Sequence, residues 1–326
     1  MRNLKKVREP GKPRVVVLEE HFEAPEMSDG GHGRSGVYTA GVNEVADLLA
    51  DLGERRIAAM DAAGIDLQIL SHTAPAAQNR DPETAVRLAR SANDLLHRTV
   101  AAKPDRFAGF AILPTPDPAE SVRELERGIT VLGFKGAMIH GLTHGEFIDG
   151  KKYWPIFALA EELDVPIYIH PASPHPAVVE AYYKEYPIMI RAGWGFGVEA
   201  GTQAVRLILS GLFDAHPKLK IVIGHLGEGL PYLLWRCNEL LSRALTERTF
   251  REYFCEHFYI TTSGNFSHPA LLCAAMEMGV DRILFSVDYP FADNVEGRHF
   301  VDTAPLSQAD KDKILSHNAT KLLHLL

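Results

Sequence analysis

The sequence predicts a (β/α)8 barrel, in which eight parallel strands form a closed ring and a helix follows each strand. Eight short runs rich in Val, Ile, Tyr and Phe recur along nearly the whole chain, each too short for a buried helix. Longer stretches with apolar residues three and four positions apart separate these runs. This alternation is typical of parallel strands joined by helical crossovers.

The predicted strands span residues 14–20, 67–71, 107–113, 136–139, 166–169, 220–223, 258–262 and 282–287. The predicted helices span residues 43–63, 82–101, 119–131, 153–163, 201–213, 230–244, 269–278 and 308–325. Asp-Pro pairs at 81–82 and 117–118 are typical helix starts, and Gly53 interrupts the first helix. An open doubly wound sheet is the alternative, but no Gly-x-Gly-x-x-Gly motif follows the first strand.

Composition predicts one globular unit. We expect residues 14–326 to form a single barrel after a tail of low order at residues 1–13, because no linker or repeat divides the chain. The net charge is −8 and both signs are mixed along the chain, which gives no reason to expect nucleic acid or an anionic membrane as a partner. The three cysteines lack Cys-x-x-Cys spacing and no signal peptide is evident, so we expect a cytoplasmic protein with free thiols.

The first predicted strand ends in two residues suited to a metal site. Glu19 and His21 are two positions apart, so they share one face of the strand, whereas Glu20 faces the other way. A carboxylate and an imidazole on one face form half of a divalent-metal site. The glycine-rich loop at residues 23–39 follows this strand and is expected at the barrel mouth, where it can act as a lid.

Three later strands also end in metal-binding residue types. His170 and His225 occupy corresponding places after the fifth and sixth strands, and Asp288 ends the eighth. Taken singly, a histidine at a strand end is more often a structural residue than a ligand, and Asp288 can be a helix cap or a turn carboxylate. Four strand ends that offer Glu, His or Asp on the catalytic face of a barrel predict a metal-centred site, because neighbouring buried carboxylates are costly without a cation.

Segments spread from the first strand to the last carry a family resemblance. They lie at residues 18–22, 133–137, 166–171, 210–214, 224–231, 262–266 and 285–291, and include Leu-Glu-Glu-His-Phe, Gly-His-Leu-Gly-Glu-Gly-Leu-Pro and Phe-Ser-Val-Asp-Tyr-Pro-Phe. In these segments the chain resembles the amidohydrolase-like superfamily, and more closely its branch of aromatic-acid decarboxylases. That branch holds the γ-resorcylate, 2,3-dihydroxybenzoate, 5-carboxyvanillate and aminocarboxymuconate-semialdehyde decarboxylases.

The resemblance implies a metal site with one ion. It makes four residues the ligands of that divalent ion, namely Glu19, His21, His170 and Asp288. Zn²⁺ is expected, Mn²⁺ and Mg²⁺ are alternatives, and no organic cofactor is implied. Binuclear members carry a bridging lysine or carboxylate near the end of the fourth strand. Lys135 lies near the start of that strand instead, so a second ion is not expected.

The implied activity is non-oxidative decarboxylation of an o-hydroxy aromatic acid, the reaction of a carboxy-lyase. Asp288 is expected to protonate the carboxyl-bearing ring carbon, while His225, oriented by Glu228, exchanges a proton with the hydroxyl. The resemblance also implies a homodimer or homotetramer, with Arg236 near a subunit contact and the site. The residues expected around the substrate are Phe22, His140, His144, Arg236 and Phe291.

Two other functions are compatible with a metal-bearing barrel. A hydrolase would cleave a lactone or amide with a metal-bound hydroxide on the same scaffold. A non-enzymatic binding protein would have a metal site closed by its ligands, whereas ligands at a barrel mouth leave positions open. Release of CO2 from o-hydroxybenzoates without ring opening distinguishes decarboxylation from both.

Overall fold

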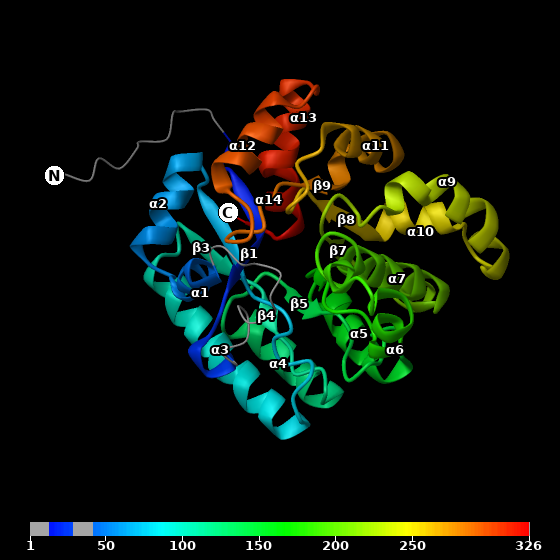
Figure 1. Cartoon of the computed structure of the whole chain (residues 1–326), viewed down its shortest axis with the longest axis horizontal. Helices are drawn as coiled ribbons and strands as arrows, with labels where there is room; N and C mark the ends of the chain where they lie inside the picture. The colour runs from blue at the N-terminus through cyan, green and yellow to red at the C-terminus, as the bar shows by residue number, and fades with distance from the viewer. Residues whose placement is uncertain (1–12, 29–41, 326) are drawn as a thin grey trace.

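The computed structural model describes residues 13–28 and 42–325. The predicted tail, apart from residue 13, and most of the predicted glycine-rich lid at residues 23–39 therefore lie outside the described residues. Figure 1 shows a ring of helices around the central strands, with α9 and α10 on one side of the molecule. Among the described residues, no helix combines the length and apolarity needed to cross a membrane.

Each predicted strand is present, and all paired strands run parallel. The strands are β1 Val16–Phe22, β2 Leu67–His72, β3 Phe107–Gly109, β4 Ala111–Ile112, β5 Ala137–His140, β6 Ile167–His170, β7 Ile221–Ile223, β8 Phe258–Thr261 and β9 Ile283–Leu284. The third predicted strand is divided into β3 and β4 at Phe110. There the amide of Phe110 donates to Leu70 on one side, while the amide of Ala111 donates to Gly136 on the other.

Hydrogen bonds after β9 close the ring on β1. The amide of Asp288 donates to the carbonyl of Glu19 at 3.1 Å, and the amide of His21 donates to the carbonyl of Tyr289 at 2.7 Å. The amide of Glu19 also donates to the hydroxyl of Ser286 at 2.6 Å. The predicted (β/α)8 barrel is thus confirmed, and its first and last strands meet where the predicted metal ligands lie.

Each predicted helix is present, but the helices begin and end at other residues than predicted. They are α1 Val42–Ala50, α2 Glu54–Ala63, α3 Pro82–Ala102, α4 Pro118–Thr130, α5 Trp154–Glu162, α6 Pro176–Val178, α7 Gly195–Leu209, α8 Leu212–Ala215, α9 Leu230–Leu241, α10 Phe250–His257, α11 His268–Met278, α12 Asn294–Thr303, α13 Gln308–Asp312 and α14 Asn318–Leu322. Gly53 divides the first predicted helix into α1 and α2. Asp81 and Asp117 cap α3 and α4, as their Asp-Pro pairs predict. The sequence prediction missed α10, α12 and the three-residue α6.

A β-bulge in β1 decides which side chains enter the barrel. Leu18 packs inside the barrel with Tyr168 and Val222, so strict alternation would place Glu20 inside and Glu19 outside. The pairing with β2 instead shifts by one residue between Val17 and Glu20. Because a bulge re-aims the residues that follow it, Glu19 faces the barrel interior and Glu20 faces away from it.

Candidate active site

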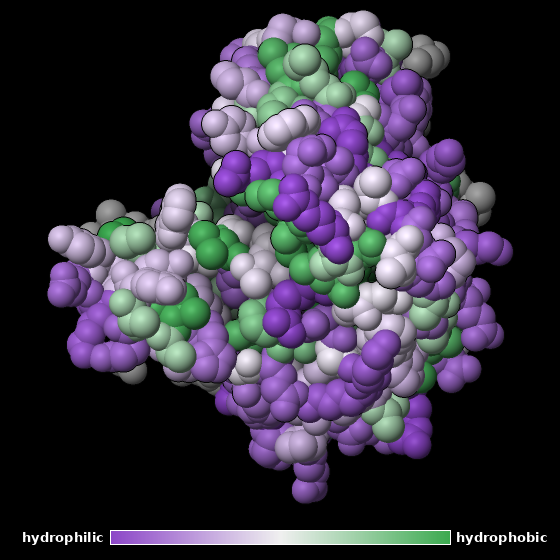
Figure 2. Space-filling model, turned by 90° about the vertical axis from the view of Figure 1, so that its right-hand side faces the viewer, coloured by the Kyte–Doolittle hydropathy of each residue, from purple (hydrophilic) through white to green (hydrophobic). Residues whose placement is uncertain are grey.

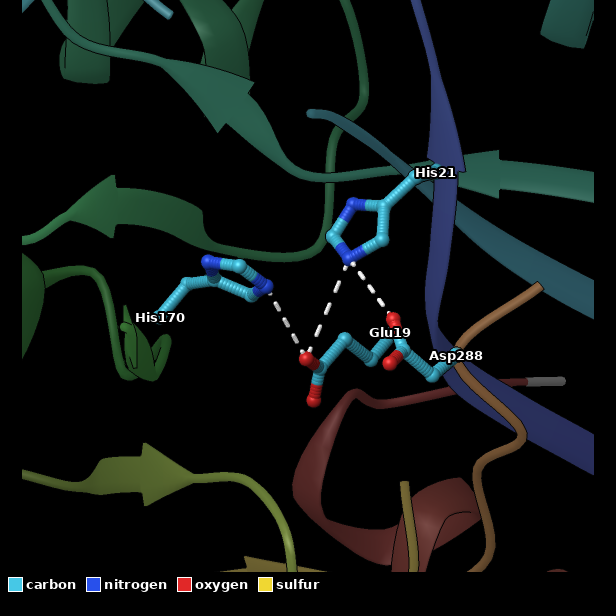
Figure 3. A group of neighbouring side chains, drawn as sticks. All are labelled: Glu19, His21, His170 and Asp288. Atoms are coloured by element: carbon cyan, nitrogen blue, oxygen red, sulfur yellow. Dashed lines mark ion pairs between the residues drawn. The ribbon is translucent and has the colours of Figure 1, made fainter. Parts of the chain in front are cut away.

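Four predicted ligands converge at the carboxyl end of the barrel. Glu19 and His21 come from β1, His170 ends β6, and Asp288 follows β9. One donor atom from each lies within 4.8 Å of the others, and the side chains point toward one another in Figure 3. Nε2 of His170 lies 3.1 Å from Oε1 of Glu19, and Nε2 of His21 lies 3.3 Å from Oδ1 of Asp288.

The donor atoms at the centre suit a cation. Oε1 of Glu19 and Nε2 of His21 are fully buried, 3.8 Å apart, and without a hydrogen-bond partner among the described residues. Buried polar atoms are ordinarily paired, so two such atoms facing one point indicate a ligand there. Two carboxylates and two imidazoles are a common ligand set for Zn²⁺ or Mn²⁺.

The electrostatics of the cluster agree with this assignment. Burial opposes a positive charge on His21, yet Asp288 and Glu19 raise the pKa of His21 to about 9. Burial also opposes ionisation of Glu19, but the neighbouring histidines, His225 foremost, lower the pKa of Glu19 well below its usual value. The raised pKa of His21 indicates that the two carboxylates attract positive charge, which a divalent ion can supply.

Two hydrogen bonds on the sides away from the centre orient His21 and Glu19. The hydroxyl of Ser71 on β2 lies 3.2 Å from Nδ1 of His21, which leaves Nε2 facing the centre. The phenol of Tyr168 on β6 donates to Oε2 of Glu19, which leaves Oε1 facing the centre. Partners of this kind fix the orientation of metal ligands. The sequence prediction missed both residues.

Glu20 holds the turn that carries Asp288. Its buried carboxylate accepts hydrogen bonds from the amides of Val287 and Tyr289, at 2.9 and 3.2 Å, and from the hydroxyl of Ser286 at 3.0 Å. Burial raises the pKa of Glu20 to about 8, against these three donors. Asp288 itself has a left-handed backbone with φ of 77°, which costs free energy in a non-glycine residue. The hydrogen bonds between Glu20 and the residues on either side of Asp288 stabilise this backbone conformation.

His225 and Glu228 form a pair beside the ligands. Nδ1 of His225 lies 2.6 Å from Oε1 of Glu228, and Nε2 lies 3.8 Å from Oε1 of Glu19 and from Oδ2 of Asp288. Burial opposes a charge on His225, but Glu228 and Glu19 raise its pKa well above the usual value. The residues from His225 to Gly229 all have positive φ, and this left-handed turn sets the two side chains side by side.

A cavity of about 270 Å³ opens on this pair. It is lined by Ala192, Phe196, Gly197, His225, Glu228, Gly229, Gly264 and Asn265. A Cβ atom at Gly264 would lie 3.1 Å from Oδ2 of Asp288 and 3.4 Å from the ring of His225. The glycine therefore keeps the space in front of the two predicted catalytic residues open.

The residues predicted around the substrate lie at different distances from the centre. Phe291 is 48% exposed, and its ring centroid lies 5.8 Å from that of His21. His140 is buried with its ring 5.1 Å from His170, and its Nε2 contacts the carbonyl of His72 at 2.7 Å. His144 is exposed and bonds the carbonyl of Arg80. Phe22 is buried on the opposite face of β1 from His21, with its ring 5.4 Å from His72.

Arg236 lies on an exposed face of α9. The same helix exposes the large side chains of Tyr232 and Trp235, by 83% and 68%. Figure 2, which views the side of the molecule where α9 lies, shows hydrophobic residues interspersed among hydrophilic ones. Arg236 does not line the cavity described above.

Glu199 on α7 is a buried carboxyl beside this region that the sequence prediction missed. One oxygen accepts a hydrogen bond from Gln203 at 2.7 Å, and the other has no partner among the described residues. Burial raises the pKa of Glu199 from 4.5 to about 8, and the charge of Glu228 adds to the rise. Glu199 therefore holds a proton at neutral pH in the folded chain.

Replacing Glu199 with Gln is expected to make stability less dependent on pH. Because the folded pKa lies above the unfolded one, the contribution of Glu199 is fully present below pH 4.5 and is lost as pH rises to about 8. The stability advantage of Glu199→Gln should grow by about 1.4 kcal/mol per pH unit in this window. Urea unfolding of both proteins at several pH values measures it, and an advantage that is constant with pH would contradict the assignment.

Comparisons with known proteins agree with this geometry. The family model for amidohydrolases matches residues 32–325. The chain belongs to the amidohydrolase family. It is 41% identical over 324 residues to a gamma-resorcylate decarboxylase from Rhizobium radiobacter, an alignment that covers 95% of this chain and 98% of the relative.

Solved structures extend the comparison to bound molecules. A 2,6-dihydroxybenzoate decarboxylase in complex with 2,6-dihydroxybenzoate is 40% identical, with a TM-score of 0.90 over 96% of this chain and 100% of that one. A dihydroxybenzoic acid decarboxylase from Polaromonas sp. JS666, with bound manganese and the inhibitor 2-nitroresorcinol, is 40% identical, with a TM-score of 0.91 over 96% and 97%. These relatives are carboxy-lyases, so the resemblance seen in the strand-end motifs is confirmed.

Proposed function

We propose that the protein is a metal-dependent decarboxylase of a benzoate that carries a hydroxyl group ortho to its carboxylate. One observation carries the proposal. The His225–Glu228 pair lines a cavity beside a four-residue centre that includes Asp288, in a chain of the amidohydrolase family. The gamma-resorcylate and 2,6-dihydroxybenzoate relatives support an o-hydroxybenzoate as the substrate class.

Glu19, His21, His170 and Asp288 would hold a single divalent ion. When bound, the ion would neutralise the carboxylate and the adjacent hydroxyl oxygen of the substrate and fix the orientation of its ring. The manganese in the Polaromonas relative supports Mn²⁺, whereas Zn²⁺ stays a prediction from the ligand set. The four side chains are suitable ligands for either ion, so the availability of each metal in the cell would decide which one is bound.

Asp288 would act as the general acid. Direct loss of CO2 would leave an unstable aryl anion, so a proton is first added to the carboxyl-bearing carbon. The bond to the carboxyl carbon then breaks, its electron pair restores the aromatic ring, and CO2 leaves. Oδ2 of Asp288 faces the space above Gly264, which suits proton delivery to a ring held in the cavity.

His225 would exchange a proton with the substrate hydroxyl. Its Nδ1 is engaged by Glu228, so Nε2 is the nitrogen available to the substrate. Glu228 orients the ring and stabilises its protonated form, as a carboxylate does for histidines in other acid–base pairs. Withdrawal of the hydroxyl proton increases the electron density at the ortho carbon, which assists its protonation by Asp288.

The remaining predicted residues define the periphery of the site. Phe291 would cover the substrate ring, while His140 at the end of β5 and His144 in the loop after it would contact ring substituents. Phe22 would contribute indirectly, by packing on the face of β1 opposite His21. The proposal includes a homodimer or homotetramer, in which the exposed Arg236 on α9 would lie near a subunit contact, and a cytoplasmic location.

Release of CO2 tests the function. Metal-free protein is reconstituted with Mn²⁺ or Zn²⁺ and incubated with 2,6-dihydroxybenzoate, and mass spectrometry follows its conversion to resorcinol. The isomer 3,5-dihydroxybenzoate, which lacks an ortho hydroxyl, is the matched control and should remain intact. Hydrolysis of a lactone or amide panel without CO2 release from any o-hydroxybenzoate would favour the hydrolase alternative.

A further inference from the structure

Tyr168 lies at the heart of the barrel beside the metal ligands. It precedes His170 by two residues on β6, so both side chains point into the barrel, and Tyr168 is fully buried. Its hydroxyl donates to Oε2 of Glu19 and lies 2.9 Å from the hydroxyl of Thr261 on β8. Three strands thus contribute to one buried hydrogen-bond chain.

The hydrogen bonds in this buried group all run in one direction, from Thr261 through Tyr168 to Glu19. The carboxylate of Glu19 only accepts hydrogen bonds, so the one proton of the Tyr168 phenol points to Oε2. The phenol oxygen then accepts from Thr261, whose hydroxyl is the only donor in that contact. Such an ordered chain holds the Glu19 carboxylate in one orientation.

The absence of a side chain at Gly224 leaves space for the Glu19 carboxylate and the Tyr168 hydroxyl. A Cβ atom there would lie 2.8 Å from Oε2 of Glu19 and 3.3 Å from the phenol oxygen of Tyr168. On the other side of the carboxylate, Oε1 has no hydrogen-bond partner among the described residues and lies 3.1 Å from Nε2 of His170 and 3.8 Å from Nε2 of His21. Oε2 of Glu19 thus binds the Tyr168 hydroxyl, while Oε1 faces the proposed metal centre.

We propose that Tyr168, supported by Thr261, is a positioning residue that reserves one oxygen of Glu19 for the metal ion. The inference rests on the proposed function, because it concerns the same metal site. A glutamate with both oxygens free can bind a metal through both. A catalytic site must instead keep positions open for its substrate, and the bond from Tyr168 keeps Oε2 out of the metal shell.

Tyr168→Phe tests the inference by removing one hydroxyl. Titration of metal-free protein with Mn²⁺, followed by electron paramagnetic resonance, should show binding weaker by about 10- to 100-fold, the usual effect of losing a partner of a metal ligand. The spectrum of the bound ion should also change. Thr261→Val should shift binding in the same direction by less, since Tyr168 keeps its bond to Glu19.

Tyr253→Phe is the matched control. Tyr253 is also a buried tyrosine whose hydroxyl donates to a carboxylate, that of Asp214, but it lies on α10 in the outer helical layer. Its Mn²⁺ binding should equal that of the wild type. Thermal unfolding of the metal-free proteins reports folding, and if Tyr168→Phe does not fold, weakened binding in Thr261→Val supports the inference and wild-type binding overturns it.

The inference is overturned if folded Tyr168→Phe binds Mn²⁺ as tightly as the wild type with the same spectrum. A separate result distinguishes the failure of the function itself. If the wild-type chain binds neither Mn²⁺ nor Zn²⁺, the proposed metal site is wrong, whatever Tyr168 does.

Discussion

Asp288→Asn is expected to reduce decarboxylation by about 10²- to 10⁴-fold while the metal stays bound, which is the usual contribution of a general acid. Asn keeps the size of Asp and one oxygen for the ion, but it has no carboxyl proton to deliver. The left-handed backbone at this position favours the exchange, because Asn adopts that region more readily than most residues. CO2 release at saturating substrate, together with metal content per chain, measures both parts of the expectation.

Asp293→Asn is the matched control for this substitution. Asp293 lies five residues further along and caps α12 through the amides of Val295 and Glu296, so Asn can replace it as a cap. Its turnover should remain at the wild-type level. Normal turnover in Asp288→Asn with the metal retained would show that the proton comes from another group.

Glu20→Ala is expected to lower both stability and metal affinity. The substitution leaves the amides of Val287 and Tyr289 and the hydroxyl of Ser286 without their acceptor in a buried place. At about 1 kcal/mol or more for each buried donor, the free energy of unfolding should fall by about 3 kcal/mol. Release of the turn also frees Asp288 from its strained conformation, so Mn²⁺ binding and turnover should fall with it.

Glu124→Ala separates these two effects. Glu124 on α4 is equally buried and accepts from Asn93 and Arg127, but it lies in the outer helical layer. Its loss should reduce stability without changing Mn²⁺ affinity in the protein that remains folded. Urea unfolding and Mn²⁺ titration of both variants provide the comparison. If the two variants bind Mn²⁺ equally well, Glu20 does not position the ligand turn.

Most of the fold could be predicted because strand and helix periodicities differ along the chain. The missed helix α10 is short, with eight residues, and apolar spacing over so few positions is weak. A local signal was nevertheless present, since Thr249 and Glu252 form a capping box at its start. The split of the third strand at Phe110 depends on hydrogen bonds to two different neighbours, which no local pattern encodes.

The clustering of the four proposed ligands could be predicted, but the residues that support them could not. Glu19 and His21 lie on β1, His170 ends β6 and Asp288 follows β9, and the parallel order of a barrel brings such positions together. The face of Glu19 depends on the β1 bulge, which is set by pairing with β2 and has no marker in the local sequence. Tyr168 had a usable signal, because it lies two residues before His170 and must share its face.

Closure of the barrel also sets the order in which the site can be completed during synthesis. The contacts from Glu20 to Val287 join residues 267 positions apart in the chain. At roughly 5 to 20 residues per second, the ribosome needs on the order of 10 to 50 s to make that interval. Until then the nascent chain carries Glu19, His21 and later His170 without their fourth partner. The four proposed ligands therefore cannot come together before the residues that follow the last strand have been made.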